Sequence, residues 1–182
     1  PNLRELQKDE DLARIISEVK RYSASKPVLV KIAPDLEDVV IKSIVDTSIE
    51  LGCAGIVATN TTVDRPDDSS IMSEKGGLSG KPLNKRSTEI IRLIADHTDG
   101  KWPIIGVGGI SNSEDAWEKI SNGASLIQIY SSMVFNGASV VKEIVNGLER
   151  KLKSKGMTDL RQAVGCSRLS LIHISEPTRR SM

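Results

Sequence analysis

The sequence is poor in aromatic residues, which make up only 3% of its 182 residues. Surfaces that bind nucleic acids commonly stack bases on aromatic rings and concentrate positive charge, whereas the net charge here is +1. We therefore predict no nucleic-acid partner. Cysteine is also scarce, because Cys53 and Cys166 are the only two and lie far apart in the chain. Their spacing predicts no metal site and fits a reducing compartment.

Long hydrophobic runs are missing as well. No stretch approaches the roughly 20 apolar residues that a membrane-spanning helix needs, and the N-terminus lacks the pattern of a signal peptide. What the chain does have is an ordinary globular composition, 38% hydrophobic and 27% charged, with enough residues for one domain with a core. It begins with Pro1 instead of Met, so we expect a piece of a longer protein.

Short apolar runs alternate with amphipathic segments along the chain. Four β-branched runs predict strands, at 27–33, 55–60, 103–109 and 125–130. Five segments with helical periodicity predict helices, at 10–24, 36–52, 85–97, 111–123 and 139–155. Gly52 is expected to end the second helix, and Asn112 or Ser113 to cap the fourth. The interval 61–83, rich in glycine and proline, predicts a loop.

This alternation predicts an α/β fold. The strands are apolar on both faces, as in a parallel sheet covered by helices. Two architectures fit the pattern: a doubly wound open sheet, and a (β/α)8 TIM barrel of which four units would form only half. The start at Pro1 favours the barrel, with the other half upstream. In both architectures the functional residues lie where strands end and loops begin.

The predicted strand ends carry polar residues and glycines. Lys31 interrupts an apolar run, which is costly unless the ammonium meets a negative partner or projects into solvent from an edge strand. The stretch "GVGGISNSED" (106–115) fits a phosphate cradle in front of a helix N-terminus, although a tight turn would explain its glycines equally. Neither His97 nor His173 belongs to a Ser–His–Asp set, so we assign them no role.

Six stretches together resemble one family. "VLVKIAPDL", "GIVATNTTVDRP", "GGLSGKPL", "PIIGVGGI", "GASLIQIYSSM" and "DLRQAVG" occur in the order and with the spacing of the second half of a class 2 dihydroorotate dehydrogenase. The resemblance runs from about Pro1 to Gly165. It implies the C-terminal half of an FMN-containing (β/α)8 barrel. The implied reaction is oxidation of (S)-dihydroorotate to orotate, with a membrane quinone as acceptor, in pyrimidine biosynthesis. The complete enzyme would be membrane-associated, while this chain has no membrane segment.

The resemblance also implies roles for ten residues. Lys31 matches the lysine beside the flavin, where its charge stabilises the anionic reduced ring. Asn60 and Thr61 match substrate-binding positions, and their amide and hydroxyl suit a small ring with amide, imide and carboxylate groups. The other implied FMN contacts are Thr59, Ser79, Gly80, Gly108, Gly109, Tyr130 and Ser131.

Two further expectations concern the catalytic base and the tail of the chain. The family's catalytic base is a serine in an "N-x-S-x-P-N-T" segment, which would fall upstream of Pro1, so no catalytic residue is assigned. The tail at 166–182 leaves the family pattern and contains "LSLIHISEPTRR", which resembles translated sequencing adapter. We expect this tail to be non-native and to pack poorly.

Two alternatives to this function stay open. One is another FMN barrel, of the class 1 dihydroorotate or dihydropyrimidine dehydrogenase type or a dihydrouridine reductase, and the other is an inactive half-barrel remnant. The oligomeric state is not predicted.

Overall fold

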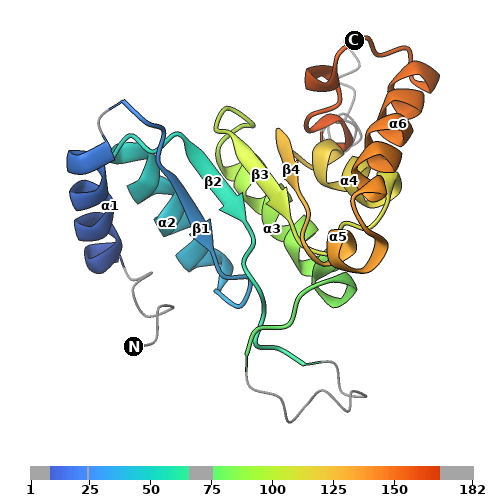
Figure 1. Cartoon of the computed structure of the whole chain (residues 1–182). Coiled ribbons are helices and arrows are strands. Elements are labelled where there is room, and N and C mark those ends of the chain that lie inside the picture. The colour runs from blue at the N-terminus through green and yellow to red at the C-terminus, as the bar shows by residue number, and fades with distance from the viewer. Residues whose placement is uncertain (1–8, 24, 66–75, 169–182) are drawn as a thin grey trace, which may run out of the picture.

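The computed structural model describes residues 9–23, 25–65 and 76–168, and is built around one parallel sheet (Figure 1). Its four strands are β1 (Leu29–Ile32), β2 (Gly55–Ala58), β3 (Ile104–Val107) and β4 (Leu126–Gln128). They lie in the order β1-β2-β3-β4, and each pairs in parallel with the next along the chain. The predicted α/β class and the four predicted strands are confirmed, although each strand is shorter than its apolar run because the run continues into a loop.

In the described ranges, six α-helices and two short 3-10 helices accompany the sheet. They are α1 (Asp9–Ser23), α2 (Asp38–Glu50), η3 (Lys81–Leu83), α3 (Asn84–His97), α4 (Ser113–Ser121), α5 (Ser131–Asn136), α6 (Ser139–Ser154) and η4 (Leu160–Gln162). The five predicted helices are confirmed. The sequence did not predict α5, η3 or η4, because segments this short hold too few apolar residues to show a periodicity.

Helices α2, α3 and α4 lie on one face of the sheet (Figure 1). The core forms there, where strand isoleucines such as Ile32, Ile56 and Ile104 are fully buried together with Ile44 and Ile94 of the helices. This burial of aliphatic side chains is what holds the βα units together.

The opposite face of the sheet is open over the described residues. The register places Lys31, Val57, Ile105 and Leu126 side by side in one row across all four strands. Leu126 on this face is 62% exposed. The predicted half-barrel accounts for this exposure, since in a closed barrel this face is the interior and is covered by the remaining strands.

The beginning of the tail packs against the fold, which corrects part of the prediction for it. Cys166 contacts the apolar cluster that includes Trp117 and Ile120, and the Arg168 guanidinium lies 2.6 Å from an Asp96 carboxylate oxygen. Leu160 of η4, Ala163 and Val164 pack in the same cluster, so the apolar pattern of this segment continues to Cys166. Residues 169–182 lie outside the described residues, as does His173, and the non-native origin of the tail stays a prediction.

Candidate active site

A cavity of about 740 Å³ opens at the carboxyl ends of the strands. All ten residues for which the sequence predicts a role line it: Lys31, Thr59, Asn60, Thr61, Ser79, Gly80, Gly108, Gly109, Tyr130 and Ser131. They come from all four strand ends and from the loop before η3, so the structure brings the whole predicted set to one rim. Their individual roles remain predictions.

The part of the cavity near β1 and β2 is here called the lysine end, and consists of Lys31, Asn60 and Thr61. Lys31 lies on the edge strand β1 and is exposed, which explains how an apolar strand tolerates a charge. Among the described residues it has no ion-pair partner. A cation that lines a cavity and has no ion-pair partner in the part of the chain that the structure describes can serve an anionic occupant.

The chain after β2 is held in place by hydrogen bonds close to the lysine end. Thr59 is buried and donates its hydroxyl to the Asn60 carbonyl at 3.0 Å, and the Asn60 side-chain oxygen accepts the Thr61 amide at 2.9 Å. Asp35 accepts the Thr62 hydroxyl and, at 3.1 Å, the Val63 amide. These contacts fix the backbone while Asn60 stays exposed to the cavity, with its side-chain amide hydrogens available as donors.

The opposite part of the cavity, the glycine end, consists of Gly108, Gly109, Ser79 and Ser131. Gly109 has a φ of 68°, and a Cβ atom there would lie 2.5 Å from the Asn84 Cβ atom. Only glycine lets the turn after β3 approach the first turn of α3 so closely. The Asn84 side-chain amide completes this contact by donating to the Gly109 carbonyl at 2.9 Å.

The helix behind the glycine turn differs from the predicted cradle in one respect. Asn112 caps α4, as the sequence predicts, and its side-chain oxygen accepts the amides of Glu114 and Asp115 at 2.9 Å each. Asp115 also accepts the Ser111 amide at 2.9 Å. Because these donors are already engaged and the first turn is acidic, α4 is poorly suited to attract an anion. Any anion at this end depends on the glycine turn and the serines.

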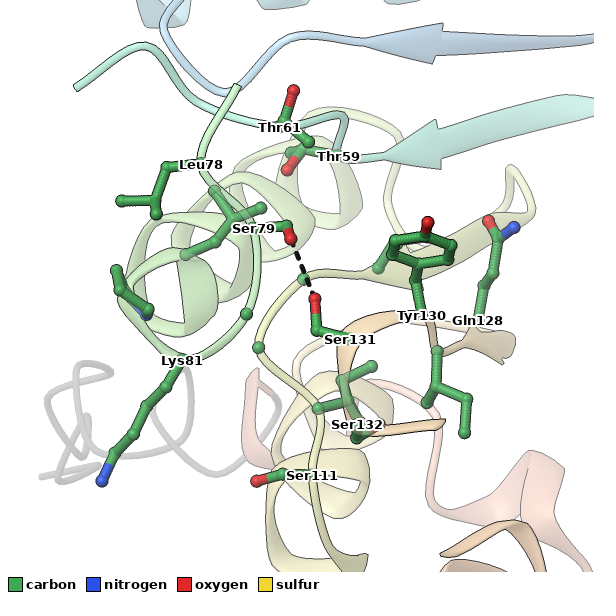
Figure 2. Close-up of a pocket in the computed structure, with 18 of the residues that line it drawn as sticks. Thr59, Thr61, Leu78, Ser79, Lys81, Ser111, Gln128, Tyr130, Ser131 and Ser132 are labelled. Carbon is green, nitrogen blue, oxygen red and sulfur yellow. Dashed lines mark hydrogen bonds between the residues drawn. The ribbon is translucent and has the colours of Figure 1, made fainter. Parts of the chain in front are cut away.

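The serine side chains of the glycine end point toward one another (Figure 2). The hydroxyl oxygens of Ser79 and Ser131 lie 2.9 Å apart, which joins the loop before η3 to the start of α5. Ser132 also lines the cavity, and its buried hydroxyl has no hydrogen-bond partner among the described residues. A buried hydroxyl without a partner is costly, so this position is suited to a ligand acceptor.

Sequence reasoning missed several polar residues of the cavity. Gln128 at the end of β4 pairs in register with Val107, and Figure 2 shows its side chain beside Tyr130. The signal was a polar residue inside the apolar run "SLIQIY". Ser111 and Lys81 also line the cavity, but polar residues in loops are too common to single them out.

The described residues contain neither a metal-ligand cluster nor a membrane-spanning helix. Within 9–23, 25–65 and 76–168, no group of three or more His, Cys, Asp or Glu side chains is placed to hold a metal ion. None of the helices in these ranges combines the length and the apolar character needed to cross a membrane.

The four-unit parallel sheet, with its polar cavity at the carboxyl ends of the strands, defines half of a (β/α)8 barrel of the kind found in enzymes. Solved structures of dihydroorotate dehydrogenase (DHODH) from Eimeria tenella are similar to it. The ligand-free form is 33% identical with a TM-score of 0.83, covering 91% of this chain and 52% of that one. The complex with ferulenol is also 33% identical in sequence, with a TM-score of 0.82. The match covers 92% of this chain and 50% of that one.

Sequence comparisons agree with this structural similarity. The family described as Dihydroorotate dehydrogenase matches residues 1–152. A protein from Trichodesmium erythraeum, named dihydroorotate dehydrogenase (quinone), is 50% identical over 175 residues, which is 91% of this chain and 46% of the relative. One of the same name from Gloeobacter violaceus is 46% identical over 168 residues, 92% of this chain and 48% of the relative.

The chain belongs to the dihydroorotate dehydrogenase family, which is a family of flavoproteins. It spans about half the length of the curated relatives it matches. The family resemblance inferred from the sequence motifs is thus confirmed.

Proposed function

We propose that this chain supplies the flavin-holding and substrate-orienting half of an enzyme that oxidises (S)-dihydroorotate to orotate with a quinone as electron acceptor. The observation that carries the proposal is the convergence of all ten predicted residues on one cavity. The names of the relatives support the quinone-dependent form of the reaction over the other FMN barrels. A complete enzyme of this kind would be membrane-associated, because its acceptor resides in the membrane.

The residues present fit FMN as the flavin. The phosphate end of FMN needs hydrogen-bond donors in a tight space, and the glycine end offers the hydroxyls of Ser79 and Ser131. The buried hydroxyl of Ser132, which has no hydrogen-bond partner within the described ranges, is a further donor. The isoalloxazine ring needs a cation beside it when reduced, and Lys31 lines the same cavity from the other side.

When bound, FMN supplies the ring that accepts a hydride from the substrate and later passes two electrons to the quinone. The residues of this chain would bind the flavin, orient the substrate and stabilise the negative charge that develops. The Lys31 ammonium places positive charge where negative charge develops, which is the usual source of electrostatic catalysis. Asn60 and Thr61 offer donors and acceptors to the polar edge of dihydroorotate, and so fix its orientation. No residue of this chain is assigned as the base that removes the substrate proton.

The test uses a complete dihydroorotate dehydrogenase that carries these residues. Lys31→Ala should slow flavin reduction by dihydroorotate about a hundredfold, which corresponds to roughly 3 kcal/mol of transition-state stabilisation. Asn60→Ala should instead raise the dihydroorotate concentration needed for half-maximal reduction, and leave the flavin bound. Stopped-flow absorbance at the flavin band measures both effects.

Lys26→Ala is the matched control, because Lys26 is exposed and does not line the cavity. It should reduce its flavin at the parent rate. If Lys31→Ala also reduces at the parent rate, Lys31 is a solvent-facing edge residue and the proposed arrangement of the lysine end is wrong.

A further inference from the structure

Lys119, on α4, is a buried cation that the proposed function does not use. Its side chain is 0% exposed, although lysine is rarely buried completely. Among the described residues it has no carboxylate partner within ion-pair distance. Instead the ammonium donates to the Asn84 carbonyl at 2.5 Å, to the Ser87 hydroxyl at 2.8 Å and to the Thr88 hydroxyl. These three bonds use all three of its hydrogens.

All three acceptors belong to the first five residues of α3, the segment on which the glycine end is built. The Ser87 hydroxyl lies 3.1 Å from the Gly108 carbonyl, and the Asn84 side-chain amide lies 2.9 Å from the Gly109 carbonyl. A Cβ atom at Gly108 would lie 2.9 Å from the Ser87 hydroxyl oxygen. The position of the glycine turn is therefore set by Asn84 and Ser87.

Lys119 decides which acceptor the Ser87 hydroxyl uses. That hydroxyl has one hydrogen, and two carbonyls lie within reach: Asn84 at 3.0 Å and Gly108 at 3.1 Å. The Asn84 carbonyl already accepts from Lys119 and, at 3.0 Å, from the Thr88 hydroxyl, which occupies both of its lone pairs, and Lys119 also donates to the Ser87 oxygen. The Ser87 hydrogen is thereby directed to Gly108. Without the ammonium, the hydroxyl is free to turn to Asn84 and release the glycine turn.

The charge of Lys119 acts in the same direction. Burial lowers the pKa of its ammonium to about 8, against the effect of Glu118 and Asp115, so it is mostly protonated at neutral pH. The α3 groups that it touches, Asn84, Ser87 and Thr88, carry no charge. A buried positive charge behind the glycine turn favours an anion in front of it.

We infer that Lys119 is a positioning residue that gives the glycine end its selectivity for the phosphate of FMN, through Ser87, Asn84 and the Gly108–Gly109 turn. The inference rests on the proposed function, since it takes the ligand of this end to be the flavin phosphate. The simpler explanation is a tie between α3 and α4 that only stabilises the fold. The two differ in what they predict for a flavin without a phosphate.

The experiment compares FMN with riboflavin, which has the same ring and ribityl chain but no phosphate. Each flavin is titrated at pH 7 with the flavin-free form of a complete dihydroorotate dehydrogenase that carries these residues, and binding is followed by flavin fluorescence. The wild-type enzyme should bind FMN more tightly. Lys119→Met should weaken FMN binding tenfold or more, on the order of one charged hydrogen bond, and change riboflavin binding less than about twofold.

Two further variants keep the test decisive. Ser87→Ala removes only the hydroxyl between Lys119 and Gly108, so it should lower the preference for FMN even if Lys119→Met does not fold. Lys151→Met is the matched control, because Lys151 contacts α4 through Glu114 and Trp117, away from the glycine turn. Its preference for FMN should equal that of the wild type.

Each result separates the two proposals. Equal loss of FMN and riboflavin binding in Lys119→Met and Ser87→Ala, or an unchanged preference for FMN in both, would overturn the positioning role and leave the proposed function standing. A wild-type enzyme that binds neither flavin, or binds riboflavin as well as FMN, would remove the premise shared with the proposed function, and the inference with it.

Discussion

The two ends of the cavity are built in different ways. At the glycine end, Gly109 packs so closely against α3 that a Cβ atom would lie 2.5 Å from the Asn84 Cβ atom, and hydrogen bonds from buried Lys119 and Ser87 fix the turn. At the lysine end, Lys31 and Asn60 are exposed, beside a sheet face on which Leu126 is 62% exposed. The chain by itself therefore determines the geometry of the glycine end. The electrostatics of the lysine end depend on what covers that face and occupies the cavity.

The largest effect is expected from a substitution that disrupts the close packing of the glycine end. Gly109→Ala forces a Cβ atom against Asn84 and a side chain into a left-handed φ of 68°. Together these should lower the free energy of unfolding by about 2–6 kcal/mol. Gly156→Ala is the control: its φ is also 68°, but nothing lies within 4 Å of the new Cβ atom.

Urea unfolding followed by circular dichroism measures both glycine variants. Gly156→Ala should lose only about 1–2 kcal/mol, the cost of the backbone conformation. The difference between the variants isolates the close approach. If both lose the same amount, the glycine turn tolerates a side chain, and the packing described for this end is wrong.

The next effect concerns pH and the buried ammonium. The pKa of Lys119 is about 8 in the folded chain and 10.5 when solvated, so between these values the unfolded chain binds more protons. The free energy of unfolding should therefore rise with pH from about 8 to about 10.5, by about 3 kcal/mol at most. Lys119→Met should lack this rise, and urea midpoints at four pH values would measure it. Parallel curves for the two chains would mean that Lys119 is not desolvated.

The smallest effect concerns the loop beside the lysine end. Asp35→Ala removes the acceptor of the Thr62 hydroxyl and the Val63 amide, and should cost about 1–3 kcal/mol of local stability. The Val63 amide should then exchange its hydrogen faster, as measured by mass spectrometry. Asp38→Ala, which breaks an exposed pair with Arg86, should change stability by less than about 1 kcal/mol and leave Val63 unchanged. Unchanged exchange in Asp35→Ala would mean that the loop is held by other contacts.

The sequence predicted the strands, the main helices and the cavity residues, because each leaves a local signal. Lys31, Asn60 and Gly109 stand out as polar or glycine residues at the ends of apolar runs. Lys119 leaves no such signal, since a lysine on a helix is normally exposed and its burial depends on α3, more than 20 residues away in the chain. The open sheet face, in contrast, follows from the half-barrel that the four-unit pattern predicts, because the interior of a barrel is exposed when the other half is missing.

The strand order has a consequence for how the site assembles. Each strand pairs with the one made just before it, so every β contact joins neighbouring βα units and loop closure stays short. During synthesis the sheet can grow one strand at a time, from the N-terminal side. The contact of Lys119 with α3 becomes possible once α4 has been synthesised. The hydrogen bond between Ser79 and Ser131 can form only later, after the start of α5 has been synthesised. The last of these four units to be translated thus completes a cavity that the three before it have already shaped.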